Sequence, residues 1–302
     1  MGFTSAGRIT TPMLEIAYES AGPEDGTPVI LMHGFPYDVR AFDDVATILG
    51  AAGCKVLAPY LRGFGGTKFR SESMLRSGQQ AALAQDLIDF MDAMGIEQAV
   101  LAGYDWGGRA ACIAAALFPS RVTGLVSVDG YNVQDLAQAE EPAPPEWEST
   151  YWYQFYFHSE RGRRGLERNR DELCKLLWTA WSPTWAGAVA AFPASSPSLH
   201  NRDFVDVVIH SYRHRFGLAI GDPRYEALEA LIAAQPPIPV PTIVLESGAD
   251  GVGGPSASDD REHFIGPFEL VLLPDTGHNV PQEASAAFAE AVLSLMPSDA
   301  PT

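Results

Sequence analysis

Short, continuously apolar runs alternate along this chain with segments of helical length. The runs are Val29–Met32, Ala99–Ala102, Leu125–Val128, Thr242–Leu245 and Leu270–Leu273. Because neither face of such a run is polar, each is typical of a strand that is covered on both faces, as in a parallel sheet. The alternation of strands and helices then predicts an α/β fold with a mostly parallel, doubly wound sheet.

Two of the intervening segments have the periodicity of amphipathic helices. In Ala81–Met94 the apolar side chains recur on one helical stripe, and Gly95 follows as a stop signal. The second segment, Pro281–Met296, presents Phe288 and other apolar residues on one face. We expect both helices to pack against the sheet.

One region breaks the alternation. Its two ends, "AQAEEPAPPEWEST" and "AAQPPIPVP", are rich in proline, and it holds Trp147, Trp152, Trp178, Trp181 and Trp185. We interpret residues 133–239 as a helical cap inserted before the strand at Thr242, and residues 1–132 and 240–302 as the α/β main domain. Ligand sites favour such junctions. We therefore expect most of these tryptophans in the core of the cap, and Trp152 in contact with substrate.

The segment "LAGYDWGGRA" places Asp105 between glycines, after a strand and before a helix that we expect at Arg109–Phe118. It has the outline of the G-x-S-x-G nucleophile elbow, with a carboxylate in place of the hydroxyl. A carboxylate that attacks a saturated carbon forms an ester whose carbonyl belongs to the enzyme, so water can cleave it, whereas a serine would be left as an ether. Asp105 therefore indicates an epoxide or an alkyl halide as substrate.

Hydrolysis of such an ester needs a base and an acid that orients the base. His278, in "LPDTGHNVPQEA", follows the run Leu270–Leu273, which places it at the carboxyl edge of the sheet. Asp250, after the strand at Thr242, completes the order nucleophile, acid, base that accompanies this elbow. Asp129, in "SVDGY", is the alternative acid.

The ester hydrolysis also needs backbone donors for an oxyanion. "HGFP", His33–Pro36, ends the run Val29–Met32 and turns over the sheet edge. The N–H groups of Phe35 and Trp106 are the expected oxyanion hole, and both residues are expected to contact substrate. We expect His33 only to hold the loop through hydrogen bonds.

No metal or cofactor site is predicted. His210 and His214 have the spacing of metal ligands on a helix, but no Glu follows His210 as in H-E-x-x-H, and a zinc site needs a third ligand. The glycine-rich "RGFGGT", Arg62–Thr67, lacks the Gly-Lys-Ser/Thr ending of a phosphate-binding P-loop. We interpret it as a turn.

Taken with these motifs, nearly the whole chain resembles the α/β-hydrolase epoxide hydrolases. H-G-F-P at His33–Pro36 and G-x-D-W-G-G at Gly103–Gly108 match that family. The resemblance implies that Tyr153, in "YQFYFH", and Tyr212, in "HSYRHR", donate hydrogen bonds to the epoxide oxygen, and that Pro36 follows a cis peptide bond. It further implies an α/β-hydrolase fold and a cofactor-independent hydrolase, acting on an ether bond, that converts epoxides to vicinal diols.

Two alternatives stay open at this stage. Haloalkane dehalogenases share D-W-G-G and would use the same three residues with Trp106 and a cap tryptophan around the halide, although Phe35 stands where an asparagine would be expected. A non-catalytic ligand-binding homologue is the other alternative. An intact set of nucleophile, acid and base argues against it, because binding alone does not require these three together.

Charge and cysteine content bear on partners. The net charge of −18 and the pI of about 4.6 repel phosphate backbones and anionic membrane surfaces, so we expect neither nucleic acid nor membrane as a partner. Three scattered cysteines, with no signal peptide and no apolar run of membrane-spanning length, favour the cytoplasm. We expect a small hydrophobic epoxide as substrate and a monomer or homodimer.

Overall fold

The computed structural model describes residues 2–296, so the last six residues of the expected main domain lie outside the described part. A nine-stranded sheet runs in the order β1-β2-β4-β3-β6-β7-β8-β9, with β5 paired to β2. The strands are β1 (Ser5–Thr10), β2 (Leu14–Ala21), β3 (Thr27–Met32), β4 (Cys54–Pro59), β5 (Lys68–Phe69), β6 (Ala99–Gly103), β7 (Val122–Val128), β8 (Thr242–Ser247) and β9 (Phe268–Leu273). From β4 to β9 the pairs are parallel, whereas β1 and β5 pair with β2, and β2 with β4, in antiparallel fashion.

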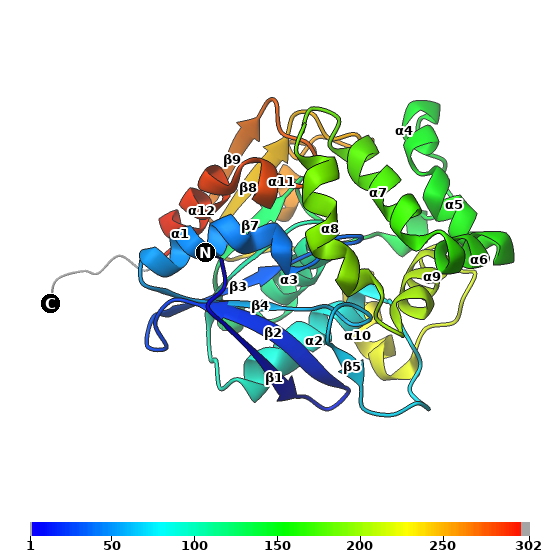
Figure 1. Cartoon of the computed structure of the whole chain (residues 1–302). Coiled ribbons are helices and arrows are strands. Elements are labelled where there is room, and N and C mark those ends of the chain that lie inside the picture. Colours follow the sequence, from blue (N-terminus) through cyan, green and yellow to red (C-terminus); the bar gives the residue numbers. More distant parts are fainter. Residues whose placement is uncertain (1, 297–302) are drawn as a thin grey trace, which may run out of the picture.

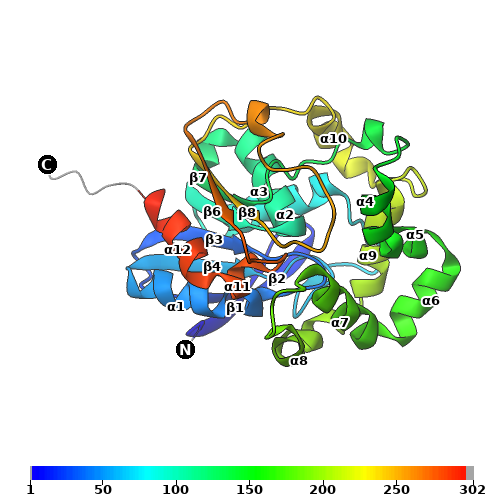
Figure 2. The same ribbon diagram turned by 90° about the horizontal axis from the view of Figure 1, so that it is seen from above.

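Helices cover both faces of the sheet, which confirms the doubly wound prediction. They are α1 (Asp43–Ala51), α2 (Gln80–Ala93), α3 (Asp105–Leu117), α11 (Val280–Glu283) and α12 (Ser285–Ser294). Helices α2 and α3 pack together on one face, and α1 packs with α11 and α12 on the other (Figure 2). None of the helices in residues 2–296 has the length and hydropathy needed to cross a membrane.

All five predicted strands are present, but two helix boundaries differ from the sequence prediction. The helix after the elbow begins at Asp105 itself and not at Arg109. The helix expected over Pro281–Met296 is split at Ala284, whose φ of −136° and ψ of 48° are not helical. The Glu283 side chain explains the split, because it turns back to accept the N–H groups on either side of His278.

The inserted region between β7 and β8 is helical, as expected. It contains α4 (Pro145–Thr150), α5 (Trp152–His158), α6 (Glu160–Arg168), α7 (Arg170–Trp181), α8 (Ala188–Leu199), α9 (Phe204–His214) and α10 (Glu226–Ile232). Helices α4 to α9 gather at one end of the sheet, whereas α10 lies against α2 (Figure 1). Trp178 and Trp181 are buried in this region. The indole N–H of Trp178 donates to the carbonyl of Pro36, 2.9 Å away, and so ties α7 to the main domain.

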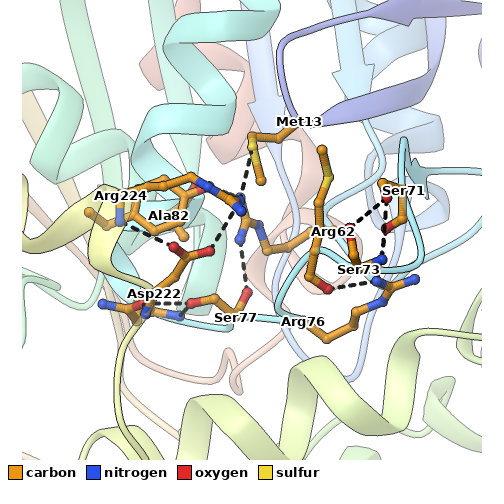
Figure 3. Close-up of polar contacts among 12 residues, drawn as sticks. Met13, Arg62, Ser71, Ser73, Arg76, Ser77, Ala82, Asp222 and Arg224 are labelled. Atoms are coloured by element: carbon orange, nitrogen blue, oxygen red, sulfur yellow. Dashed lines mark hydrogen bonds and ion pairs between the residues drawn. The ribbon is translucent and has the colours of Figure 1, made fainter.

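The segment Arg62–Thr67 is a turn, as predicted, and its arginine is fully engaged. Arg62 is 1% exposed and binds both carboxylate oxygens of Asp86 at 2.6 and 2.7 Å. It also donates to the Ser77 carbonyl (Figure 3) and to the Tyr225 hydroxyl, each at 2.9 Å. Since Tyr225 directly precedes α10, this network attaches the returning end of the inserted region to the main domain.

Candidate active site

Asp105 occupies a strained position between β6 and α3. Its φ of 51° lies in the left-handed region, which is costly for a residue other than glycine and typical of functional sites. Small neighbours make the turn possible. A Cβ on Gly107 would lie 2.0 Å from the Met32 carbonyl oxygen, and one on Gly103 would lie 2.7 Å from Gly107. The sequence therefore forces the Asp105 side chain out at the carboxyl edge of the sheet.

The loop after β3 meets this carboxylate, because β3 and β6 are neighbours in the sheet. The Phe35 backbone N–H donates to Asp105 Oδ1 at 2.7 Å, and the Trp106 N–H also contacts the carboxylate. Gly34 lies so close that a Cβ there would be 2.4 Å from Asp105 Oδ1. The Phe35–Pro36 peptide bond is cis, as the resemblance implied. These backbone donors surround the atom that would carry negative charge during ester hydrolysis.

His278 and Asp250 reach the same place from the ends of β9 and β8. The His278 Nδ1 lies 2.7 Å from Asp250 Oδ2, a strong hydrogen-bond distance, and its Nε2 lies 3.8 Å from Asp105 Oδ2. The backbone N–H of His278 donates to the Trp181 carbonyl, and the Trp181 ring packs edge-on against the imidazole. The structure thus brings Asp105, Asp250 and His278 together, with the imidazole between the two carboxylates.

Charge pairing sets the protonation states of Asp105 and His278. Burial would lower the pKa of His278, but the charge of Asp250 and the contact with Asp105 raise it well above its usual range. Burial would likewise raise the pKa of Asp105, but the proximity and charge of His278 hold it below its ordinary value. At neutral pH the site therefore holds an ionised Asp105 beside a protonated His278.

Asp129, the alternative acid, lies close by but has other partners. Its two oxygens accept the N–H and the hydroxyl of Ser247 at 2.7 and 2.9 Å. Burial, and then the charge of Asp250, raise the pKa of Asp129 to about 7. Asp129, Asp250 and His278 offer metal-ligand atoms within 4.8 Å of one another. The hydrogen bond between Asp250 and His278, and those that Ser247 donates to Asp129, account for this grouping.

The two predicted tyrosines lie together over the site. Tyr153, on α5, and Tyr212, on α9, are 4% and 1% exposed, and their rings meet edge-on with centroids 5.4 Å apart. Burial raises the pKa of both phenols, so each keeps its proton at neutral pH. The Tyr212 ring also lies 5.6 Å from Phe35 and 5.9 Å from Trp106.

A cavity of about 930 Å³ joins the nucleophile to the inserted region. Asp105, Asp250, His278 and Tyr153 all line it. Trp152 does not: its side chain is 40% exposed on α5. Phe35 and Trp106 are fully buried behind the lining, and the indole N–H of Trp106 has no hydrogen-bond partner among residues 2–296. The structure therefore does not bring Trp152 to the site.

The cavity contains two residues that the sequence reasoning missed. Arg109 and Arg215 both line it, and each is 8% exposed. Arg109 lies four residues after Asp105, so helical spacing alone places both on one face of α3. That spacing is a signal that could have identified Arg109. The lining is thus more polar than the small hydrophobic substrate expected from the sequence would require.

His33 and His210 have structural hydrogen-bond partners. His33 accepts the Leu61 N–H at Nε2, and its Nδ1 lies 3.0 Å from the Gly34 carbonyl, so the prediction that it holds the loop is confirmed. His210 accepts the Gly78 N–H, and its other ring nitrogen lies 3.1 Å from the Ile220 carbonyl.

Comparison with known proteins agrees with this geometry. The sequence profile of the alpha/beta hydrolase fold matches residues 27–281. The chain belongs to the α/β-hydrolase fold family. This α/β-hydrolase is similar to a Klebsiella pneumoniae protein of known structure, provisionally described as an epoxide hydrolase, with 44% identity over 97% of this chain and 98% of that chain and a TM-score of 0.95.

Curated relatives point the same way. Epoxide hydrolase A of Mycobacterium tuberculosis is 26% identical over 98% of both chains. The epoxide hydrolase of Caballeronia sordidicola is 25% identical over 94% of this α/β-hydrolase and 90% of its own length.

Proposed function

We propose that this α/β-hydrolase is an epoxide hydrolase that forms vicinal diols through an ester on Asp105. The observation that carries the proposal is the pair of buried phenols, Tyr153 and Tyr212, beside a cavity that also exposes an elbow carboxylate. A carboxylate nucleophile suits both epoxides and alkyl halides, but only the epoxide leaves an alkoxide that needs a proton. In this scheme residues 133–239 form the cap that supplies the phenols.

In the first step Asp105 attacks one ring carbon and the C–O bond to the ring oxygen breaks. Tyr153 and Tyr212 donate hydrogen bonds to that oxygen, and one of them gives up its proton, so the products are a neutral alcohol, an ester and a phenolate. The rigid turn at Asp105 and the N–H of Phe35 hold the attacking carboxylate in place. No cofactor takes part in this step.

Ester formation itself prepares His278 for the second step. The negative charge of Asp105 is one of the groups that raise the pKa of His278. Alkylation removes that charge, so the pKa of His278 falls and its proton can return to the phenolate through solvent. The neutral imidazole, oriented by Asp250, then takes a proton from the water that attacks the ester carbonyl. The N–H groups of Phe35 and Trp106 form the oxyanion hole for this step.

The decisive experiment traps the ester. In the His278→Gln variant the first step should proceed and the second should be slow, so intact-protein mass spectrometry should find the enzyme plus one whole epoxide. A haloalkane would instead add the alkyl group without the halogen. A His278→Gln enzyme that never gains mass, while the wild type releases diol, would contradict the ester mechanism.

Isotope labelling checks the site of water attack. In a single wild-type turnover in ¹⁸O-water, the label should enter Asp105 and not the diol, because water attacks the carbonyl carbon of the enzyme's ester. Label in the first-turnover diol would mean that water opens the epoxide directly. Chloride release from haloalkanes without diol release from any epoxide would favour the dehalogenase alternative.

A further inference from the structure

Two buried arginines beside the nucleophile form no ion pair with any acid of residues 2–296, although Arg109 lies close enough to Asp105 for the two charges to interact. Arg62, the other buried arginine of residues 2–296, shows the usual arrangement, with the carboxylate of Asp86, two carbonyls and the hydroxyl of Tyr225 around its guanidinium. By contrast, the only side-chain hydrogen bond of Arg109 within that range runs from Nε to the Asn132 carbonyl at 3.1 Å. Arg215 Nη2 is buried without any partner there.

This arrangement is costly for the empty protein. A buried cation is normally paired, and two like charges near each other raise the cost further. Burial, and then the neighbouring charge of Arg215, lower the pKa of Arg109 to about 9, while the charge of Asp105 opposes this shift, so the Arg109 guanidinium is still cationic at neutral pH. An anion bound between them would relieve both the desolvation and the repulsion.

The carboxylates of the cavity are committed elsewhere. Asp105 pairs with His278 and loses its charge when the ester forms. The remaining acids of the lining accept hydrogen bonds from other groups or lie towards the solvent-exposed rim; they are Asp129, Asp250, Glu140, Glu141, Glu148, Glu246 and Asp260. None of them makes an ion pair with Arg109 or Arg215.

The two arginines lie within reach of a group attached to the epoxide ring. The Arg215 guanidinium carbon lies 4.4 Å from the centre of the Tyr212 ring, and Arg109 lies one helical turn beyond Asp105. A ring held by the tyrosines and attacked by Asp105 would therefore present a substituent between the two guanidinium groups. Guanidinium groups bind carboxylates through paired, charge-assisted hydrogen bonds.

We propose that the preferred substrates are anionic epoxides, in which a carboxylate on or next to the oxirane ring binds between Arg109 and Arg215. This inference rests on the proposed epoxide hydrolase function and replaces the expected hydrophobic substrate with an acidic one. Exposed acids at the mouth of the cavity, such as Glu140 and Glu141, slow the approach of such a substrate. Their charges are screened at physiological salt, whereas the charges of the buried arginine pair are screened much less.

A matched pair of probes tests the proposal. Glycidate and glycidamide have the same shape and differ in charge, so the ratio of their kcat/KM values reports recognition of the carboxylate. The wild type should prefer glycidate, even though the negative charge of Asp105 repels it. Arg109→Gln and Arg215→Gln should each lower that ratio by roughly 10- to 100-fold, since hydrogen bonds to charged groups are the strong ones.

Controls separate recognition from folding and from chemistry. Arg213→Gln alters a neighbouring arginine that pairs with Glu160 outside the cavity, and it should leave the ratio unchanged. Arg109→Lys and Arg215→Lys keep the charge and should retain part of the preference. If the arginines only stabilise the phenolate of Tyr212, both probes will lose activity equally and the ratio will not move, which overturns the proposal. A wild type that prefers glycidamide also overturns it.

The failure of this inference is distinguishable from failure of the proposed function. Turnover of neutral epoxides with no preference for glycidate would reject the anionic substrate but would still support the proposed epoxide hydrolase function. If no epoxide is hydrolysed, calorimetry with glycerate, the diol of glycidate, still decides the matter. Binding to the wild type that is lost in Arg109→Gln and Arg215→Gln supports the carboxylate site, and absence of binding overturns it. Chloride release from chloroacetate, without hydrolysis of any epoxide, would show that the enzyme is a dehalogenase. It would still support carboxylate binding between Arg109 and Arg215.

Discussion

Removing the hydroxyl groups of Tyr153 and Tyr212 should block epoxide opening and leave the fold intact. Both side chains are buried, yet each Tyr→Phe change deletes only one atom and preserves the ring contact at 5.4 Å. Tyr153→Phe removes the hydrogen bond from Gln154 Nε2, at 3.2 Å, and the hydroxyl contact with Tyr212, which the wet cavity can replace in part. Their loss should lower the free energy of unfolding by only about 1 kcal/mol.

The effect on catalysis should be much larger. A buried donor to a developing oxyanion contributes about 2–4 kcal/mol, or roughly 30- to 1000-fold in rate. Because the two phenols adjoin each other, the remaining one can partly replace the one that is lost. We therefore expect about 30-fold slower opening in each single variant and about 10⁴-fold in the double variant, more than the product of the two.

The assay should follow the first step alone. In the His278→Gln background, rapid quenching and intact-protein mass spectrometry give the rate at which Asp105 becomes alkylated. Tyr156→Phe is the matched control, because Tyr156 lies on the same helix as Tyr153 but its ring contacts Trp152 and Phe157 and not the two phenols. If the double variant is alkylated within about threefold of the parent rate, far from the expected loss of about 10⁴-fold, the role of the phenols is refuted.

Three further predictions concern the carboxylates and the loop that faces them. Asp250→Asn should slow ester hydrolysis by about 10³–10⁴-fold, so that mass spectrometry finds the alkylated enzyme accumulating. Asp129→Asn should keep the rate of ester hydrolysis within about tenfold of wild type. If the two losses are reversed, Asp129 is the acid. The raised pKa of Asp129 means that the folded state keeps the proton of this carboxyl group up to about pH 7, whereas the unfolded chain releases it near pH 4. The stability that the protonated carboxyl contributes is therefore complete below pH 4 and is lost as the pH rises to 7. Asp129→Asn should therefore raise the free energy of unfolding at pH 8 by about 1–2 kcal/mol, with little change at pH 4, and equal urea midpoints at pH 8 would contradict this. Gly34→Ala should lower kcat/KM at least about 100-fold, because its Cβ would push Asp105 off the Phe35 N–H, whereas Gly254→Ala, which has open space, is the control.

The sequence predicts the central strands and the meeting of Asp105, Asp250 and His278 well because both depend on local patterns. The elbow at Asp105 is dictated by adjacent glycines, and the places of Asp250 and His278 follow from the strands before them. The burial of Arg215 could not be predicted in the same way. It sits at the end of an amphipathic helix among other basic residues, and only the packing of that helix over the main domain distinguishes it from its partly exposed neighbours Arg213 and His214.

The same limit explains the misplaced tryptophan and the broken helix. The aromatic content of the inserted region predicts that some rings line a cavity, but the face of a short helix that is buried depends on its partners. Trp152 faces outwards on α5 while Tyr153, the next residue, faces inwards. The break at Ala284 depends on hydrogen bonds that Glu283 makes across a tight loop, and helical periodicity carries no information about them.

The order of strands in the sheet has a consequence for how the chain folds. Strand β7 pairs with β8 only after the whole inserted region has been synthesised, because Leu125 lies opposite Thr242. Until then β7 is an unpaired apolar edge, the kind of surface that recruits other chains. Asp250 and His278 also follow the insertion, so Asp105 can meet these two side chains only after the whole insertion has been synthesised, through contacts between residues that are distant in sequence. Long-range pairing of this kind is intrinsically slow.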